Sequence, residues 1–312
     1  MAACCGFGKA LKSTDETRWT VDAASAGGTL ASRMAEALLL SQEDAADLID
    51  FGSVQVNGRQ ERHPKRLLQT GDLVQVHWPR HGTLRHYEID PGRILFEDGV
   101  LLVYDKERGV PSQQTPYDAY NNLYAGLIRY LGKTRQPRTA LGLHHRLDRE
   151  TTGVMVFTLD SRANRNLGRA FESRGVLKEY LAWVGGSPPW DVWTREDDIG
   201  RKGGRYATVP KGRGKPAETR FEILYRSENR SLVRARPLTG RTHQIRLHLA
   251  ASGCPILGDR LYGGGPWDFP CLHAYRLNLR HPVSGRRLEW TAPIPPDWPE
   301  PRQAATPGEP RR

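Results

Sequence analysis

Residues 142–160 read GLHHRLDRETTGVMVFTLD, and this stretch decides the fold expected of the chain. The apolar run from Val154 to Phe157 predicts a buried strand. The loop before it holds one carboxylate, Asp148, between Arg146 and Arg149. Catalytic groups are often placed on loops that a rigid element supports, and an aspartate beside arginines is expected to be ionised at neutral pH, as a nucleophile or a base must be. The alternative is a structural Arg–Asp pair that closes a surface loop.

Length and charge limit the classes of protein to consider. The chain has 312 residues, which favours two domains plus tails. Its 46 Lys and Arg against 35 acidic residues give a net charge of +11, which favours nucleic acid as a partner over membrane lipid. The chain shows no apolar stretch near the roughly 20 residues that span a bilayer and no secretory signal, so a cytoplasmic location is expected. The four cysteines lack C-x-x-C spacing, which predicts free thiols and no zinc at Cys4, Cys5, Cys254 and Cys271.

The first part of the chain predicts a small domain behind a flexible leader. Residues 1–27 lack sustained periodicity and form the predicted leader. Residues 28–85 predict two helices, the second capped by Ser41, and then a small sheet around the turn GSVQVNG at 52–58. This pattern resembles the RNA-binding module of ribosomal small-subunit protein four. Because the second helix is acidic, the candidate phosphate contacts are the basic residues after the turn, with a solvated basic loop as the alternative: Arg59, Arg62, Lys65 and Arg66.

The second domain is predicted at residues 92–298, after a linker at 77–91 and before a disordered tail at 299–312. Two apolar runs around Asp98-Gly99 predict a β-hairpin over residues 94–105. Residues 122–131 predict a helix that Gly132 ends, and Asp160 is expected to cap another. Strands are predicted at 176–184 and 221–236, and a helix at 242–251.

Three sequence blocks carry a resemblance to a known family. HRLDRETTG resembles the catalytic loop, HRLD-x-x-TSG, of the RluA-type pseudouridine synthases, with Thr152 where serine is usual. Lys178 to Ala182, KEYLA, is similar to the K-x-Y-x-A strand of that family. Residues 237–248, PLTGRTHQIRLH, are similar to its third block. The likeness extends over about residues 94–298, in the order and spacing of the family.

The resemblance implies an α+β catalytic domain on a mixed or antiparallel sheet with flanking helices, preceded by the small α/β RNA-binding domain. It implies an isomerase that converts specific uridines of structured RNA to pseudouridine, with ribosomal RNA favoured and transfer RNA open. Because the reaction changes neither atoms nor oxidation state, no cofactor and no metal are expected. RNA is then the expected partner, and the protein is expected to be a monomer.

The resemblance also implies roles for single residues. Asp148 attacks the sugar, adds to the base or removes the ribose 2′ proton, and Arg241 pairs with it. Tyr180 stacks on the target base and transfers a proton. Arg146 fills the space that the flipped uridine leaves, and Lys178 contacts phosphate or supports its strand. The family has an irregular sheet segment at 187–217, where a nucleic-acid path or plain solvation accounts for the basic residues Arg201, Lys202 and Arg205.

Two competing functions come from other classes. A non-catalytic RNA-binding or ribosome-associated factor could use the same fold. A metal-dependent hydrolase could use His144 and His145. His243 and His248, on the predicted helix, are a poor zinc pair, because zinc-binding histidines on a helix need i, i+4 spacing and these two are five residues apart. The sequence shows no P-loop and no dinucleotide-binding fingerprint.

Overall fold

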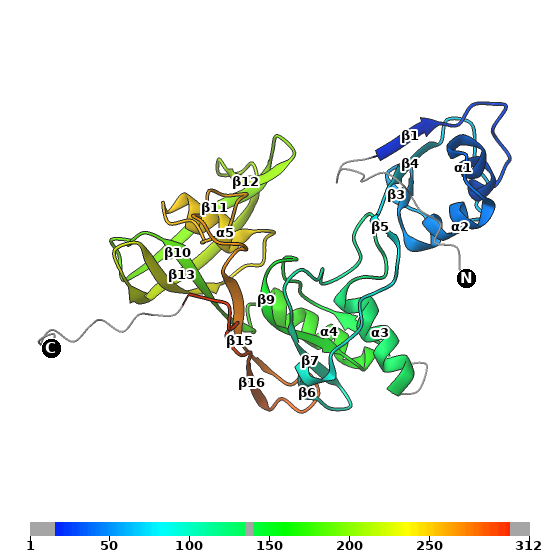
Figure 1. Cartoon of the computed structure of the whole chain (residues 1–312). Helices are drawn as coiled ribbons and strands as arrows, with labels where there is room; N and C mark the ends of the chain where they lie inside the picture. The colour runs from blue at the N-terminus through cyan, green and yellow to red at the C-terminus, as the bar shows by residue number, and fades with distance from the viewer. Residues whose placement is uncertain (1–15, 135–139, 300–312) are drawn as a thin grey trace, which may run out of the picture. The chain divides into compact units, whose positions relative to one another are not determined.

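The computed structural model of the chain describes residues 16–134 and 140–299, which divide into two compact units (Figure 1). The first unit comprises Met1–Ile89 with Pro111–Pro137, and the second comprises Asp90–Val110 with Arg138–Arg312. Within the described ranges, no helix is long and apolar enough to cross a membrane. The expected tail at 299–312 and the leader up to residue 15 lie outside the described residues, apart from Pro299.

Two short helices and a four-stranded antiparallel sheet form the described core of the first unit, in the strand order β1-β4-β2-β3. The elements are β1 (Glu16–Thr20), α1 (Leu30–Leu38), α2 (Gln42–Phe51), β2 (Val54–Val56), β3 (Arg59–Gln60), β4 (Leu73–His77) and β5 (Arg80–Thr83). The Ser41 hydroxyl accepts the Asp44 N–H, so the predicted cap of α2 is confirmed. Asn57 and Gly58 both have positive φ, at 54° and 73°, which suits the two-residue turn between β2 and β3.

The predicted leader 1–27 is wrong over its last part. Residues 16–20 form β1, which pairs with β4, and Val21 is buried in the core of this unit. Trp19 packs against the same core. The pattern is too short to show a period, because this segment contributes just Trp19 of β1 and Val21, directly after the strand, to the core.

The predicted boundary between the domains also needs correction, because a later segment belongs to the first unit. The Ala119 N–H donates to the Phe51 carbonyl oxygen at 2.9 Å, and the Ser53 hydroxyl donates to the Tyr117 carbonyl oxygen at 3.0 Å. The predicted helix follows as α3 (Leu123–Thr134), and Gly132 lies inside it rather than after its end. Backbone hydrogen bonds between residues far apart in sequence leave no local signal, so this exchange could not be read from composition.

In the second unit, eleven described strands form one sheet, in the order β12-β11-β13-β14-β10-β15-β9-β7-β6, with β16 beside β15 and β8 beside β9. The strands are β6 (Ile94–Glu97), β7 (Leu101–Lys106), β8 (Gly142–Leu143), β9 (Thr152–Thr158), β10 (Leu177–Gly185), β11 (Val192–Lys202), β12 (Arg205–Val209), β13 (Lys215–Arg226), β14 (Arg230–Pro237), β15 (Leu272–Arg280) and β16 (Arg287–Thr291). The helices are α4 (Ser161–Glu172), α5 (Gln244–Ala251) and a 3-10 turn at Pro91–Arg93. The expected α+β class with a mixed sheet is confirmed.

The sheet of the second unit has two antiparallel parts that meet at β9 and β15, the parallel pair. His273 lies beside Thr152 and Ala274 beside Gly153. Gly153 has φ of +111°, and a Cβ there would lie 2.2 Å from the Ala274 carbonyl oxygen, so this position requires glycine. The Thr152 hydroxyl contacts His273 Nδ1 at 2.7 Å across the same pair. This join fixes the strand that follows the Asp148 loop.

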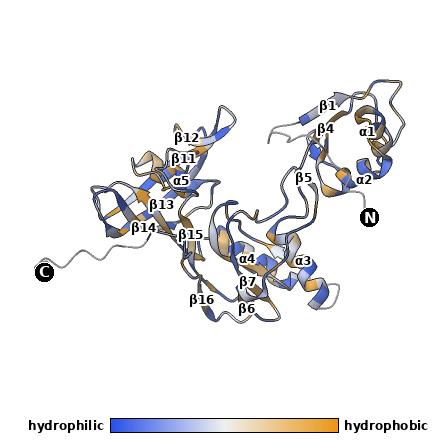
Figure 2. Cartoon of the chain, viewed as in Figure 1, coloured by the Kyte–Doolittle hydropathy of each residue, from blue (hydrophilic) through white to orange (hydrophobic). Residues whose placement is uncertain are grey.

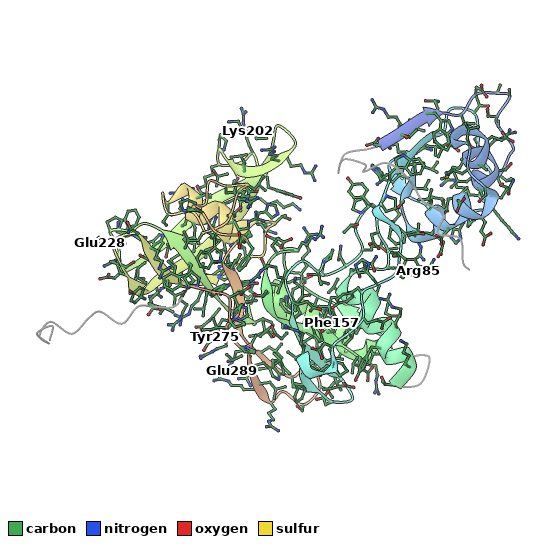
Figure 3. All side chains as sticks on the ribbon, in the orientation of Figure 1. Arg85, Phe157, Lys202, Glu228, Tyr275 and Glu289 are labelled. Atoms are coloured by element: carbon green, nitrogen blue, oxygen red, sulfur yellow. The ribbon has the colours of Figure 1, made fainter. Side chains whose placement is uncertain are left out.

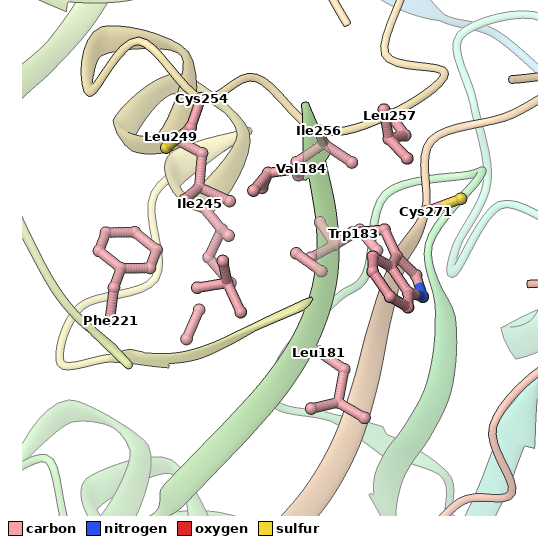
Figure 4. Close-up of a cluster of buried hydrophobic side chains, with 14 of the residues drawn as sticks. Leu181, Trp183, Val184, Phe221, Ile245, Leu249, Cys254, Ile256, Leu257 and Cys271 are labelled. Atoms are coloured by element: carbon pink, nitrogen blue, oxygen red, sulfur yellow. The ribbon is translucent and has the colours of Figure 1, made fainter. Parts of the chain in front are cut away.

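Two hydrophobic clusters cover the two parts of this sheet. In the first, Ile245 and Leu249 of α5 lie on the side of β10 that Val184 faces, and Trp183 lies on the opposite side of that strand, toward Cys271 (Figure 4). In the second, α4 packs through Leu167 on strands β7 and β9. Hydrophobic residues accordingly recur along the central strands (Figure 2), and Phe157 of β9 is fully buried (Figure 3).

Local predictions for the second unit hold where the signal is short-range. The hairpin at 94–105 is confirmed as β6 and β7, and the Asp160 side chain caps α4 by accepting the Arg162 N–H. The irregular segment expected at 187–217 is wrong, because β11 and β12 form a regular hairpin that turns at Gly203 and Gly204, beside Lys202 (Figure 3). Positive φ values of 57° and 78° explain the two glycines at this turn.

Candidate active site

The loop that carries Asp148 lies between β8 and β9, and hydrogen bonds with the turn at Gly109 hold it in place. The Gly109 N–H donates to the Arg149 carbonyl oxygen at 3.0 Å, and Arg149 Nε donates to the Gly109 carbonyl oxygen at 2.8 Å. The buried Lys106 ammonium donates to the same Arg149 oxygen at 3.0 Å and to two other backbone oxygens. The backbone oxygen of Arg149, next to Asp148, therefore accepts from both Gly109 and Lys106.

The Arg246 guanidinium joins Asp148 to a second carboxylate. Arg246 lies on α5, and its Nε and Nη2 donate to the two oxygens of Asp259 at 2.7 and 2.8 Å. Its Nη1 donates to Asp148 Oδ2 at 3.1 Å. The Asp259 side chain is 1% exposed, whereas that of Asp148 is 22% exposed. The bidentate pair with Asp259 therefore fixes the plane of the guanidinium and leaves one N–H for Asp148.

Arg246 stays protonated in this environment. Burial acts to lower its pKa, but the hydrogen bonds and negative charges of Asp259 and Asp148 raise the pKa of Arg246 above its ordinary value. A permanent positive charge thus lies 3.1 Å from the partly exposed carboxylate of Asp148.

Arg241, the expected partner of Asp148, is placed elsewhere. Its Nε donates to the Pro216 carbonyl oxygen at 3.0 Å, and its backbone N–H donates to Gln244 Oε1 at 2.9 Å. The reason is local: α5 begins at Gln244, so Arg241 lies on the turn before the helix while Arg246 lies within it. The predicted Arg241–Asp148 pair is therefore corrected to Arg246–Asp148.

Tyr180 lies on β10, half-buried, and its phenol is influenced by Asp148. Burial, and next the negative charge of Asp148, raise the pKa of Tyr180 above its ordinary value. The hydroxyl is therefore protonated at neutral pH, so it can donate a proton but cannot take one. Its ring retains the aromatic face that the sequence analysis assigned to stacking on a base.

His243 is a second polar group beside Asp148, and the sequence analysis considered it only as a metal ligand. Its Nε2 lies 3.8 Å from Asp148 Oδ2, and its Nδ1 lies 2.7 Å from the Tyr262 hydroxyl oxygen. The Tyr262 hydroxyl in turn donates to the Tyr206 carbonyl oxygen at 3.1 Å. Burial lowers the pKa of His243 despite the opposing influence of Asp148, so the imidazole is neutral at pH 7.

Basic and polar side chains border the site on its exposed side. Arg146 is exposed, and its Nη2 donates to the Thr242 hydroxyl oxygen at 3.0 Å. The Arg201 guanidinium lies 5.2 Å from the centre of the Tyr206 ring, and hydrogen bonds with Thr242 and Arg201 lower the pKa of Tyr206. The structure thus brings Arg146 and Arg201 to one edge through Thr242 and Tyr206. Lys202 and Arg205 are exposed at the tip of the same hairpin.

The remaining predicted RNA contacts differ in how free their side chains are. Lys178 is half-buried with its Nζ 3.5 Å from the Thr239 carbonyl oxygen, which favours the support of its strand. Arg62 donates to the Asp50 backbone and side chain and to the Tyr120 hydroxyl, and Arg66 donates to Glu61 at 2.7 Å. Arg59 and Lys65 are exposed.

Neighbouring histidines have structural roles. His145 is stacked on Phe171 and accepts the Val156 N–H at Nε2, 3.0 Å away. His144 Nε2 lies 3.0 Å from the Thr158 hydroxyl oxygen. Both rings are thus engaged with β9 and not with Asp148.

Arg246, Asp259 and the link from His243 through Tyr262 to Tyr206 were not predicted from the sequence. Arg246 stands in the quoted block THQIRLH, where its place inside the predicted helix 242–251 was the available signal. No sequence signal marked Asp259, because its partner Arg246 lies 13 residues away and the two meet only through a tight turn. In that turn Gly258 has φ of +77°, and a Cβ there would lie 1.9 Å from the Phe269 carbonyl oxygen.

Comparison with known proteins gives this geometry a family. Residues 100–251 match the family model described as RNA pseudouridylate synthase. The ribosomal large subunit pseudouridine synthase D of Haemophilus influenzae is 32% identical over 277 residues, which are 81% of this chain and 83% of that protein. An uncharacterized RNA pseudouridine synthase of Mycobacterium bovis is 35% identical over 287 residues, which are 87% of this chain and 92% of that protein.

The solved structures agree with this assignment. The structure of human RNA pseudouridylate synthase domain containing 4 matches with a TM-score of 0.55 and 26% identity, over 65% of this chain and 88% of that one. The curated relatives share about a third of their residues with this chain over most of both lengths. On these grounds the chain belongs to the RNA pseudouridylate synthase family and is a pseudouridine synthase.

Proposed function

We propose that the chain isomerises uridines of large-subunit ribosomal RNA to pseudouridine and that Asp148 is the reacting carboxylate. One observation carries the role of Asp148: a buried Asp259 holds Arg246 so that a single N–H reaches Asp148, whose side chain stays 22% exposed. The choice of RNA rests on the names of the Haemophilus influenzae relatives and on the net charge of +11. Transfer RNA is the competing substrate.

The neighbours of Asp148 supply the other requirements of the reaction. The carboxylate attacks the sugar, adds to the base or removes the ribose 2′ proton, and the hydrogen bond from Arg246 orients it in each case. Tyr180 presents a ring on which the base can stack and a hydroxyl that can donate a proton. Because the reacting atoms are out of reach in a paired helix, the uridine must be flipped out, and exposed Arg146 is suited to fill the space it leaves.

We further propose that the first unit binds RNA in the manner of the ribosomal protein that its sequence resembles, in the cytoplasm where ribosomal RNA is found. The turn at Asn57 and Gly58 and the exposed Arg59 and Lys65 beside and after it support this role. Arg62 and Arg66 contribute less, since carboxylates of the same unit already pair with them. Binding should weaken steeply as salt rises, because contacts to phosphate release counterions.

The test is Asp148→Asn, which keeps the size of the side chain and removes its charge. Pseudouridine formation on transcribed large-subunit ribosomal RNA should fall by several orders of magnitude, as it does when a reacting group is lost. The fold should survive, since one charge-assisted hydrogen bond contributes about 1–3 kcal/mol of a stability of roughly 5–15 kcal/mol. Asp50→Asn is the matched control, because Asp50 also lies among arginines but in the first unit.

The products are mapped by sequencing after chemical labelling of pseudouridine, with transfer RNA as a parallel substrate. A folded Asp148→Asn protein with wild-type turnover would return Asp148 to the role of a structural ion pair. Turnover on transfer RNA alone would correct the substrate. Tight RNA binding without any pseudouridine from the wild-type protein would favour the non-catalytic RNA-binding factor.

A further inference from the structure

The segment that follows Asp259 forms a pocket that the proposed reaction does not use. Its volume is about 500 Å³, which is within the range of sites that hold small molecules. Arg260 and Asp268 are exposed in it, and Trp267 is half-buried. We call it the Trp267 pocket, and its lining residues all belong to this one segment: Arg260, Gly264, Gly265, Pro266, Trp267 and Asp268.

Backbone hydrogen bonds and close glycine packing fix the shape of this segment. The Asp259 carbonyl oxygen accepts the N–H groups of Tyr262 at 3.1 Å and Gly264 at 2.8 Å. A Cβ on Gly264 would lie 2.0 Å from the Ile256 carbonyl oxygen, so the backbone leaves no room for a side chain there. The Trp267 pocket is therefore formed before a ligand binds, and binding does not have to order it.

One route of contacts joins the pocket to the reacting carboxylate. Asp259 directly precedes Arg260, and its two oxygens accept from the Arg246 guanidinium at 2.7 and 2.8 Å. The same guanidinium donates to Asp148 Oδ2 at 3.1 Å. The wall of the pocket and the reacting carboxylate are therefore held by one arginine.

The Trp267 ring is held from a second side. It lies edge-on to the Phe269 ring, with centroids 6.4 Å apart. The Arg108 guanidinium lies 3.1 Å from the centre of the Phe269 ring and donates to both oxygens of Asp297, at 2.6 and 3.2 Å. Arg108 directly precedes Gly109, whose hydrogen bonds hold the loop of the reacting carboxylate. The aromatic wall of the pocket is thus fixed relative to the active site.

The two charged side chains of the pocket are not neutralised by the protein. In the described part of the chain, neither Arg260 nor Asp268 forms an ion pair, with the other or with a third side chain. A ligand that satisfies both must bring a negative group to the guanidinium and N–H donors to the carboxylate, which only accepts when it is ionised. A flat face on the same ligand would stack on the Trp267 indole. A nucleotide has all three features.

Among the bases of RNA, guanine matches the carboxylate best. Its Watson–Crick edge has two adjacent N–H donors, on ring nitrogen one and the exocyclic amino group, and these match the two oxygens of Asp268. On the same edge, adenine, cytosine and uracil each place an acceptor beside the donor, and that acceptor would face a carboxylate oxygen. Unstacked bases of RNA are commonly recognised by an aromatic ring together with hydrogen bonds to this edge.

We propose that the Trp267 pocket binds an unstacked guanosine of the RNA near the target uridine, with its base against Trp267 and Asp268 and its phosphate at Arg260. The proposal rests on the function proposed above, because it makes the pocket one determinant of which uridine is modified. Arg260 then contributes affinity without base preference, and Asp268 contributes the preference.

Mononucleotides test the pocket without any catalysis. Guanosine 5′-monophosphate should quench the tryptophan fluorescence of the full chain saturably, with an affinity about tenfold or more above that of uridine 5′-monophosphate. Asp268→Asn should remove this preference, because an amide has only one acceptor oxygen for two N–H groups. Arg260→Gln should weaken both nucleotides and keep their ratio. Equal affinity of the wild-type protein for the two nucleotides overturns the proposal.

Two matched tryptophan variants locate the bound base. Trp267→Phe keeps an aromatic ring and removes the indole, so the quenching by guanosine 5′-monophosphate should be lost while calorimetry still detects binding. Trp190→Phe is the control and should quench as wild type does, because Trp190 is 47% exposed in the same unit and does not line the pocket. Quenching that persists in Trp267→Phe places the base elsewhere and overturns the proposal.

Inosine, which lacks the exocyclic amino group of guanine, tests the role in substrate choice. Each guanosine near the uridine mapped for the wild-type protein is replaced in turn within a ribosomal RNA fragment. One replacement should lower kcat/KM about tenfold in the wild-type protein, and Asp268→Asn should be insensitive to it. Equal kcat/KM for every inosine-containing fragment overturns the proposal and leaves the synthase activity intact.

The outcomes separate this inference from the proposed function. Wild-type protein that forms no pseudouridine overturns the proposed function and, with it, the role of the pocket in choosing the uridine. The mononucleotide titrations still decide in that case whether the pocket binds guanosine. Circular dichroism of each variant establishes that the comparisons are made on folded protein.

Discussion

Two aspartates among arginines, Asp50 in the first unit and Asp148 in the second, show how similar residues produce different sites. Asp50 accepts from Arg62 Nη2 at 3.2 Å, from Arg85 Nη2 at 2.6 Å and from the Tyr120 hydroxyl at 2.6 Å. Burial acts to raise its pKa, but the hydrogen bonds from Tyr120 and Arg62 outweigh it, and the pKa of Asp50 is lowered. In the first unit, therefore, one carboxylate accepts hydrogen bonds from two arginines.

At Asp148 the arrangement is reversed, because one arginine donates hydrogen bonds to two carboxylates. Arg246 gives two N–H groups to Asp259 and one to Asp148. Asp50 is more exposed, at 41% of its side chain against 22% for Asp148, yet its oxygens are the more fully engaged. The comparison predicts that a reacting carboxylate is distinguished by how many donors it receives and not by the number of arginines near it in the sequence.

The sharpest test of this comparison is Arg246→Lys against Arg241→Lys. A lysine cannot donate bidentately to Asp259 and also reach Asp148, so Arg246→Lys should slow pseudouridine formation on the order of 10²- to 10³-fold. Arg241→Lys should stay within about threefold of wild type, because the contact of Arg241 with Pro216 is a single hydrogen bond at an exposed residue. Single-turnover rates measure both. Equal losses in the two variants would restore Arg241 as the partner of Asp148.

A smaller effect is expected on the stability of the second unit when the pH is lowered. Burial lowers the pKa of His145 to about 3 and those of His248 and His273 to about 4. In the unfolded chain their pKa is about 6.5, so the folded state binds fewer protons between these values. The stability they contribute is complete above about pH 6.5 and is lost as the pH falls toward about 4.

The variant His145→Gln isolates one of these groups, since the glutamine oxygen can still accept the Val156 N–H. Urea unfolding at pH 6 and pH 5 should show a loss of stability per pH unit that is smaller in the variant by up to about 1.4 kcal/mol. Wild type and variant with the same pH dependence would show that His145 does not resist protonation in the folded state.

The smallest effect is expected at the other side of the comparison, Asp50→Asn. Its ion pairs are well exposed, so the free energy of unfolding should fall by only about 0.5–1 kcal/mol, and less at high salt. Turnover per folded molecule should not change. Thermal unfolding at two salt concentrations measures the first, and the rate on ribosomal RNA the second. A large loss of turnover would show that the Asp50 cluster has more than a structural role.

Short-range patterns carried most of what the sequence could predict. The strand after Asp148, the Asp98-Gly99 hairpin and the caps at Ser41 and Asp160 depend on neighbours a few residues away, and all four are confirmed. Asp148 itself was singled out because its loop and its motif are local.

Long-range contacts account for what the sequence could not show. Whether Arg241 or Arg246 reaches Asp148 depends on where α5 begins, and a left-handed residue, His243, sets that start. Asp259, Tyr262 and Tyr206 join the site through turns and a hairpin, with no periodicity that marks them. Strand β1 and the segment 111–137 were misplaced for the same reason, since distant backbone partners determine where they belong.

The short parallel join between β9 and β15 has a consequence for how the protein folds. Its two residue pairs bring together positions as far apart as Thr152 and His273, which are separated by 121 residues in the chain. Closing so long a loop is entropically costly, so contacts of this kind form slowly compared with hairpins such as β6–β7. The Asp148 loop directly precedes this join, and it is set only when the join closes. Recovery of turnover after dilution from urea should therefore follow the slowest refolding phase of the second unit, behind the recovery of its secondary structure.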